Sequence, residues 1–262
     1  MDIVWQILIG LATIFIGFLI GSAWQAAKRS RAYWQSHRFW KPLLSGDVVI
    51  VADKFGQDTP ELRGWEASGL VGGGGMQAAL EVVELLEDFR LLRVGRKASI
   101  VYHNESGKVD DALKSNLFCI GGPDANRVTA KILNHIGYKI PENRGFSPHL
   151  RPGRIYDPTS GTDVSDDKGD ALDYGRLIRV QNPYRKGRCV FILWGNSGYG
   201  TWAAAKLLRS QQLRDSASVK QGLDVDFQFQ TEVSGQVAQE PVVTRVTELS
   251  PNVPDLAVLG PP

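Results

Sequence analysis

The sequence predicts an α/β protein with one N-terminal transmembrane helix, followed by a three-layer domain whose sheet is mostly parallel and has antiparallel C-terminal edge strands. Three observations predict this architecture. Residues 3–21 contain no charged side chain, strand-like and helix-like segments alternate from residue 45 onward, and the last segments before residue 249 alternate apolar with polar residues. Strands that alternate with helices favour parallel pairing, whereas a period of two is typical of half-exposed strands.

The first segment, IVWQILIGLATIFIGFLIG at 3–21, is long enough to cross a bilayer. At ~1.5 Å per residue it forms a helix about 28 Å long, close to the thickness of the hydrocarbon layer. A cleaved signal peptide would carry basic residues before its apolar core, and here only Asp2 precedes it. The basic residues follow it, so the positive-inside rule places the globular part in the cytoplasm. We therefore expect a single-pass protein of the cell membrane, with membrane lipid as a partner.

Three glycines of this helix, Gly10, Gly17 and Gly21, lie near one face, and GFLIG matches a small-xxx-small pattern. Small residues let two membrane helices approach closely, which would favour a homo-oligomer through this face. The alternative is a face that only contacts lipid.

Residues 22–44 combine aromatic side chains with five basic ones, a composition typical of the membrane interface. We therefore assign 1–44 to the anchor and a juxtamembrane helix. A first helix packed on the globular domain is the alternative, and Pro42 ends the helix in either case.

The globular domain is predicted at 45–249, with a β insertion at 141–188 and a flexible, proline-rich tail at 250–262. Continuous β-branched runs indicate buried strands, and apolar residues at helical spacing indicate helices. The predicted parallel strands are 46–53, 98–103, 116–122 and 189–195, the helices are 76–92, 125–137 and about 200–209, and the edge strands are 224–233 and 241–249.

Charge and cysteine content exclude several functions. The net charge is +2, but after residue 44 there are 25 basic against 27 acidic residues, so we expect no nucleic-acid partner. Cys119 and Cys189 lie in apolar runs without metal-ligand spacing, which favours buried thiols. The aspartates between 157 and 173 do not match the spacing of a calcium loop. We interpret that segment as a solvated loop and expect no metal.

Three glycine-rich segments precede predicted helices: GLVGGGGMQ at 69–77, IGGPDANRVT at 120–129 and WGNSGYGTW at 194–202. In a parallel sheet all such connections lie at one edge, here called the rim, where ligands bind. The first N–H groups of a helix are unpaired, its dipole favours an anion, and glycine lets a phosphate approach. We therefore predict a small anionic or nucleotide-type ligand at the rim. Tight turns are the alternative, because none of the segments matches a known phosphate motif.

The predicted ligand contacts come from these segments and from the end of the first strand. They are Gly73, Gly74, Gly75, Gly121, Gly122, Asn126, Asn196, Ser197, Gly198, Gly200, Thr201, Asp53 and Trp194. Asn126 and Thr201 are placed either to cap their helices or to touch the ligand, and Trp194 is placed where an aromatic ring could face a base. Catalytic residues and cofactor are not assignable. Ser197 lies outside a GxSxG motif with no base evident, and Asp53 is the first candidate if the rim is catalytic.

The segments GGPDANRVT, YGRLIRVQNPY and FILWGNSGYGTWAAAKLL follow one another in a familiar order. Over about 116–210 they resemble a Rossmann-like domain of S-layer-type and membrane-tethered prokaryotic proteins. The resemblance implies a Rossmann-like fold but no activity, because the family has no settled one. It would favour an extracellular domain, whereas the basic flank at 28–41 favours the cytoplasm. It draws attention to Gly121, Gly122, Asn126, Asn182, Gly200 and Thr201.

The sequence therefore favours a membrane-anchored cytoplasmic domain that senses a nucleotide or other anion, in a signalling or defence role by analogy of architecture. Two alternatives stay open. One is a membrane-tethered hydrolase or transferase that acts on a nucleotide or sugar-phosphate, and the other is a non-catalytic envelope scaffold.

Overall fold

The structure is a computed structural model that describes residues 13–18, 20–22, 24, 36–52, 73–88, 98–138, 171–234 and 237–249. Much of the predicted anchor, including Gly10, lies outside these residues. Its described parts are helical, and a Cβ atom added at Gly17 or Gly21 would have no neighbour within 4 Å. Within the described ranges, no helix has both the length and the apolar character needed to cross a membrane.

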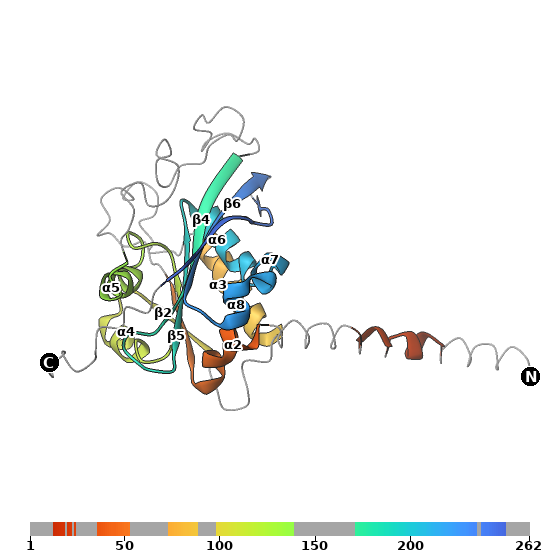
Figure 1. Cartoon of the computed structure of the whole chain (residues 1–262), viewed down its shortest axis with the longest axis horizontal. Coiled ribbons are helices and arrows are strands. Elements are labelled where there is room, and N and C mark those ends of the chain that lie inside the picture. Colours follow the sequence, from red (N-terminus) through yellow and green to blue (C-terminus); the bar gives the residue numbers. More distant parts are fainter. Residues whose placement is uncertain are drawn as a thin grey trace, which may run out of the picture.

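One mixed sheet of eight strands forms the middle layer, in the order β2-β1-β3-β5-β4-β6-β7, with β8 also paired to β6 (Figure 1). The strands are β1 Val48–Ala52, β2 Ala98–Tyr102, β3 Asn116–Ile120, β4 Ala171–Gln181, β5 Cys189–Gly195, β6 Val225–Ser234, β7 Val237–Ala238 and β8 Val242–Glu248. Pairing is parallel from β2 through β5 and antiparallel from β5 through β4 to β6, β7 and β8.

The four strands predicted to be parallel do pair in parallel, but antiparallel pairing is not confined to the C-terminal edge strands, because it also includes β4. Residues 182–188 join β4 to β5, which is too short for a crossover and therefore makes the two strands an antiparallel hairpin. β4 comes from the second half of the predicted insertion, and its other edge pairs with β6. The insertion is therefore part of the main sheet, and its first half lies outside the described residues.

Helices cover both faces of the sheet (Figure 1). α4 and α5 lie on one face, whereas α2, α3, α6, α7 and α8 lie on the other. Their bounds are α2 His37–Trp40, α3 Gly73–Asp88, α4 Ser106–Ala112, α5 Arg127–His135, α6 Gly198–Leu207, α7 Gln211–Asp215 and α8 Ala217–Gln221, and a 3-10 helix, η1, spans Lys41–Ser45. The predicted three layers are therefore present.

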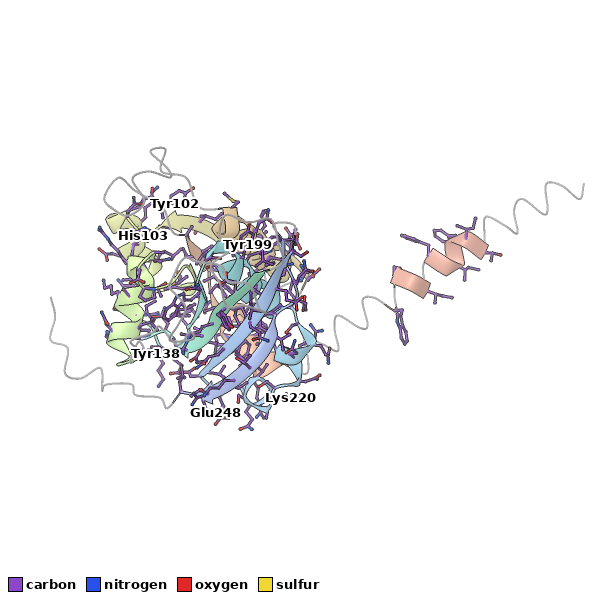
Figure 2. The ribbon with its side chains drawn as sticks, turned by 90° about the horizontal axis from the view of Figure 1, so that it is seen from above. Tyr102, His103, Tyr138, Tyr199, Lys220 and Glu248 are labelled. Atoms are coloured by element: carbon purple, nitrogen blue, oxygen red, sulfur yellow. The ribbon has the colours of Figure 1, made fainter. Side chains whose placement is uncertain are left out.

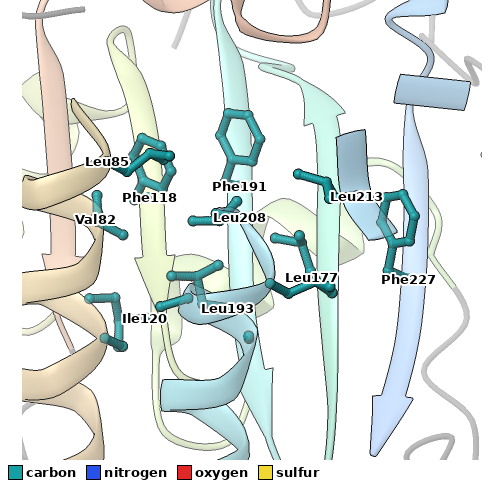
Figure 3. Packing of buried hydrophobic residues seen from close by; sticks show 14 of the residues in the cluster. Val82, Leu85, Phe118, Ile120, Leu177, Phe191, Leu193, Leu208, Leu213 and Phe227 are labelled. Atoms are coloured by element: carbon teal, nitrogen blue, oxygen red, sulfur yellow. The ribbon is translucent and has the colours of Figure 1, made fainter. Parts of the chain in front are cut away.

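The larger core lies between the sheet and the α3 and α6 side. Figure 3 shows Val82 and Leu85 of α3 facing Phe118, Ile120, Phe191 and Leu193 of the strands, with Leu208 and Leu213 over Leu177 and Phe227. The alternate residues of the same strands, among them Leu117, Cys119, Val190 and Ile192, form a second core on the α4 and α5 side. A strand buried on both faces explains the continuous apolar runs in the sequence.

The segment 36–45 belongs to the globular domain, as the second of our two expectations had it. Phe39, Trp40 and Leu43 are fully buried in the larger core. Trp40 stacks on Phe191 of β5, and its indole N–H donates to Ser36 Oγ at 3.0 Å. The domain therefore begins by residue 36 rather than at 45.

One end of the outer edge of β2 is closed by a side chain. The N–H of His103 donates to Ala52 O of β1, so the N–H and C=O of Tyr102 face away from β1. The Glu105 carboxylate accepts from the Tyr102 N–H at 3.1 Å, and the Glu105 N–H donates to Tyr102 O at 3.0 Å.

Candidate functional site

The candidate site is the rim, where β1, β3 and β5 end and where the N-termini of α3, α5 and α6 lie. Figure 2 shows Tyr102, His103 and Tyr199 along this side of the domain, away from Lys220 and Glu248. The strand order reverses between β1 and β3, because β2 lies on one side of β1 and β3 on the other. Such a switch point is where open sheets bind ligands. Asp53, predicted to face it, lies outside the described residues.

Asn126 bridges the two strands at the switch point. Its amide N–H₂ donates to Val51 O of β1 at 3.0 Å and to Ile120 O of β3 at 2.8 Å. Its Oδ1 accepts from the N–H groups of Val128 and Thr129, which caps α5. The cap is the first of the two roles predicted for Asn126. Both hydrogens and the oxygen of the fully buried amide are therefore bonded within the protein.

Gly122 packs against Trp194, and the N–H of the neighbouring Gly121 donates to Leu193 O at 2.8 Å. Gly121 has φ = 97°, a conformation that favours glycine. A Cβ atom at Gly122 would overlap the indole of Trp194. Trp194 is only 3% exposed, and the Arg176 guanidinium lies over its ring at 5.8 Å. The place where we predicted a base is therefore occupied by protein, because β4 lies beside β5 and contributes Arg176.

The N-terminus of α6 is bonded to side chains of the protein itself. Ser197 Oγ accepts from the Tyr199 N–H at 3.1 Å and donates to Asp173 Oδ2 of β4. The same carboxylate oxygen accepts from the Gly200 N–H at 2.6 Å. Thr201 Oγ1 accepts from the Gly195 N–H at 3.1 Å and donates to Ser197 O at 3.2 Å. The N–H groups of Tyr199 and Gly200, predicted to meet an anion, therefore already have acceptors.

Two further predicted residues complete this connection. Asn196 is buried, and its N–H donates to Tyr174 O at 2.8 Å. Gly200 leaves no room for a side chain, because a Cβ atom there would lie 2.5 Å from Tyr174 O. Close packing between β4 and α6 therefore explains why glycine is found at position 200 of this connection.

Asp173 is the residue that the sequence interpretation missed. We placed it in a solvated loop, but it lies in β4 and is fully buried. Burial raises its pKa from 3.8 to about 6, although hydrogen bonds from Ser197, Tyr174 and Gly200 act in the opposite direction. The strand within the predicted β insertion begins at Ala171, and so it includes Asp173, which we assigned to the acidic loop before it.

The N-terminus of α3 differs from the other two. Gly73, Gly74 and Gly75 form its first turn, whereas we predicted a glycine turn before a helix starting at 76. A Cβ atom at Gly74 would overlap Gly198 O of α6, so the two helix N-termini touch. Gly73 is exposed with open space around it, and the first turn contains no acidic residue. Among the described residues, no acceptor bonds the N–H groups of Gly73–Gly75.

The structure therefore sorts the predicted contacts into two groups. One surrounds the switch point and consists of Gly121, Gly122, Asn126 and Trp194, all buried. The other lies where α3 meets α6 and contains Gly73, Gly74, Gly75, Asn196, Ser197, Gly198, Gly200 and Thr201. Exposed backbone occurs in the second group, at Gly73 and Gly198.

A buried ionic network lies on the α5 side of the sheet and was not predicted. Arg176 of β4 donates to Asp226 Oδ2 of β6 at 2.9 Å, and the Tyr138 hydroxyl donates to the same oxygen at 2.9 Å. Burial raises the pKa of the Asp226 carboxyl, and Arg176 lowers it in part. Burial and the Asp226 carboxylate together raise the pKa of Tyr138.

We next consider metal ligands and cysteine thiols in the described part of the chain. There, no three His, Cys, Asp or Glu side chains gather as metal ligands would. Cys119 and Cys189 are free and buried in different cores, and burial raises the pKa of each thiol. Both cysteines are the buried apolar residues that their sequence context predicted.

Comparison of the chain with protein-family models, curated proteins and solved structures yields no match in any of the three. The functional argument therefore depends on the geometry of the rim.

Proposed function

We propose that this chain is a membrane-anchored, cytoplasmic ligand-binding domain that senses a small nucleotide-type anion at the N-terminus of α3. The observation that carries the proposal is the difference among the three rim helices. Asn126 caps α5, and Asp173 and Ser197 accept hydrogen bonds from the first N–H groups of α6. In contrast, α3 begins with three glycines and has no acidic residue in its first turn. A helix N-terminus with free N–H groups favours a phosphate or carboxylate.

The contact between α3 and α6 supports a sensing role. Gly74 and Gly198 lie against each other, so an anion bound at α3 would lie next to the N-terminus of α6. The segment 36–45 follows the predicted anchor and packs on β5, the strand that leads into α6. Ligand binding at the rim is thereby joined to the membrane side of the chain through contiguous packing. Self-association of the predicted helix 3–21 would be the output.

A thermal-shift experiment on the full chain in detergent tests the proposal. Inorganic pyrophosphate, mononucleotides, dinucleotides and cyclic nucleotides are added one at a time. A ligand at about 100 times its Kd should add ~2.7 kcal/mol to the free energy of unfolding. Gly73→Asp places a carboxylate at the N-terminus of α3 and should abolish the shift.

Gly107→Asp is the matched control, because Gly107 is also exposed in the first turn of a helix with open space around it. This variant should keep the full shift. A flat response to every anion, or an equal shift in Gly73→Asp, would contradict the proposal and favour the scaffold alternative.

A further inference from the structure

Ser197 has a partner that an ordinary capping serine lacks. It lies in the sharp connection between β5 and α6, half-buried, and its hydroxyl donates to the carboxylate of Asp173. Ser210 caps α7 in the same way, by accepting from the Leu213 N–H, but its hydroxyl has no carboxylate partner among the described residues. Capping alone explains Ser210, whereas Ser197 also donates to a buried carboxylate that itself accepts from the Gly200 N–H.

Asp173 is fixed in position by groups other than Ser197. The Tyr174 N–H donates to Oδ1 at 2.7 Å, and the Gly200 N–H donates to Oδ2 at 2.6 Å. Its register partner in β6 is Thr231, and no cationic side chain among the described residues shifts its pKa. A nucleophile, an adjacent base and groups that orient the base are the parts of an activated serine. The raised pKa of Asp173, about 6, suits a base that works near neutral pH.

Backbone donors lie beside the serine. Gly198 follows Ser197 directly and is exposed, and the first turn of α3 packs against it at Gly74. The N-termini of α3 and α6, each a source of backbone donors, therefore meet at Gly198, the residue after Ser197. Such donors stabilise the negative charge that develops on an oxygen during attack at a carbonyl.

We propose that Ser197 and Asp173 form a nucleophile–base pair that hydrolyses a carboxylic ester at the junction of α3 and α6. Ser197 Oγ bonds to the acyl carbon while its proton passes to Asp173 Oδ2. The bond from the acyl carbon to the alcohol oxygen then breaks, and the alcohol leaves with that proton. Water next attacks the carbonyl carbon of the acyl-serine and gives a proton to Asp173. The bond from the acyl carbon to Ser197 Oγ then breaks, Oγ takes that proton from Asp173, and the acid is released. The net reaction is ester plus water to acid plus alcohol.

This inference goes beyond the proposed function, because it adds turnover to binding. The test uses the full chain in detergent with a fluorophosphonate probe, which labels activated serines, and with p-nitrophenyl butyrate as the substrate. We expect one label, which peptide mass spectrometry places on Ser197 in the unmodified chain. Asp173→Asn should slow labelling about 100-fold, the size of a typical general-base contribution.

Ser210→Ala is the matched control and should label at the rate of the unmodified chain. The labelling rate should rise with pH and level off above the pKa of Asp173. Peptide mapping of the unmodified folded chain decides the matter even if a variant at Ser197 fails to fold. A chain that stays unlabelled, or labels only elsewhere, overturns the inference. The anion-dependent thermal shift would be unaffected by that result, so the two proposals fail separately.

Discussion

The indole of Trp40 stacks on the ring of Phe191, with centroids 5.4 Å apart and planes 19° apart, and Phe191 stacks in turn on Phe118 at 4.7 Å. This column joins the segment before the first strand to β5 and β3. The segment that follows the predicted membrane anchor is thus part of the core that supports the rim.

Removal of this segment should cost much of the stability of the domain. Trp40→Ala should lower the free energy of unfolding by about 3–5 kcal/mol, as for other large core aromatics. Lys41→Ala, at an exposed neighbouring position, should change it by less than about 0.5 kcal/mol. Urea unfolding followed by circular dichroism measures both. Equal effects of the two variants would show that the column is dispensable.

Asp173 should make stability depend on pH. Its pKa is raised to about 6 in the folded chain from 3.8, so between these values the folded state binds more protons than the unfolded state. Stability from this group is therefore greatest below about pH 4 and is lost as pH rises through 6, by about 3 kcal/mol in all. Denaturant midpoints across pH 4–8 should show this slope, and Asp173→Asn should reduce it. If the slope is unchanged in Asp173→Asn, other titrating groups cause it, and Asp226 is the first candidate.

Asn126 should contribute more to the free energy of unfolding than a helix cap alone does. Its loss leaves the carbonyls of Val51 and Ile120 and two N–H groups of α5 without partners. We expect Asn126→Ala to cost about 2–4 kcal/mol, from the cap and the buried carbonyls together. Asn104→Ala, on the exposed surface nearby, is the control. A loss below about 1 kcal/mol would mean that water replaces the bridge.

Two neighbouring glycines of α3 should respond in opposite ways. Gly74→Ala forces a methyl group into Gly198 O, and we expect a loss of about 1–3 kcal/mol. Gly73→Ala meets open space and should be neutral, or stabilise the helix by up to about 1 kcal/mol. Thermal unfolding of the two variants side by side measures the difference. If both stabilise, the helix N-termini are not in contact.

Removing one partner of the buried Arg176–Asp226 pair should lower the free energy of unfolding more than replacing both. Both side chains are 4% exposed, so Asp226→Ala leaves a buried cation and should cost about 3–5 kcal/mol. The double variant Arg176→Met, Asp226→Leu should cost clearly less. A double variant as unstable as the sum of the single variants would contradict this account.

The sequence predicted what depends on local pattern. Buried strands such as β1, β3 and β5 read as continuous apolar runs, and the sites for helices α5 and α6 followed from glycine turns and helical spacing. Pairing partners were harder to predict, because the pairing of β4 with β6 joins segments far apart in the sequence and the pairing of β4 with β5 is indicated only by their short connection, 182–188. That pairing also places Asp173 behind α6 and Arg176 over Trp194. Asp173 in a polar run and Trp194 near the end of a strand are both expected to be exposed until the neighbouring strand is known.

The pair of hydrogen bonds between Glu105 and Tyr102 has a consequence for crowding. If the predicted anchor holds the chains in one membrane plane, they would meet often, and an open strand edge would let them pair with one another in a growing sheet. With its last outward N–H and C=O already bonded to Glu105, β2 offers an incoming strand an incomplete edge. The hydrogen bonds of Glu105 therefore disfavour the addition of further chains along this edge. This leaves association to surfaces that close on themselves, such as a face between two membrane helices.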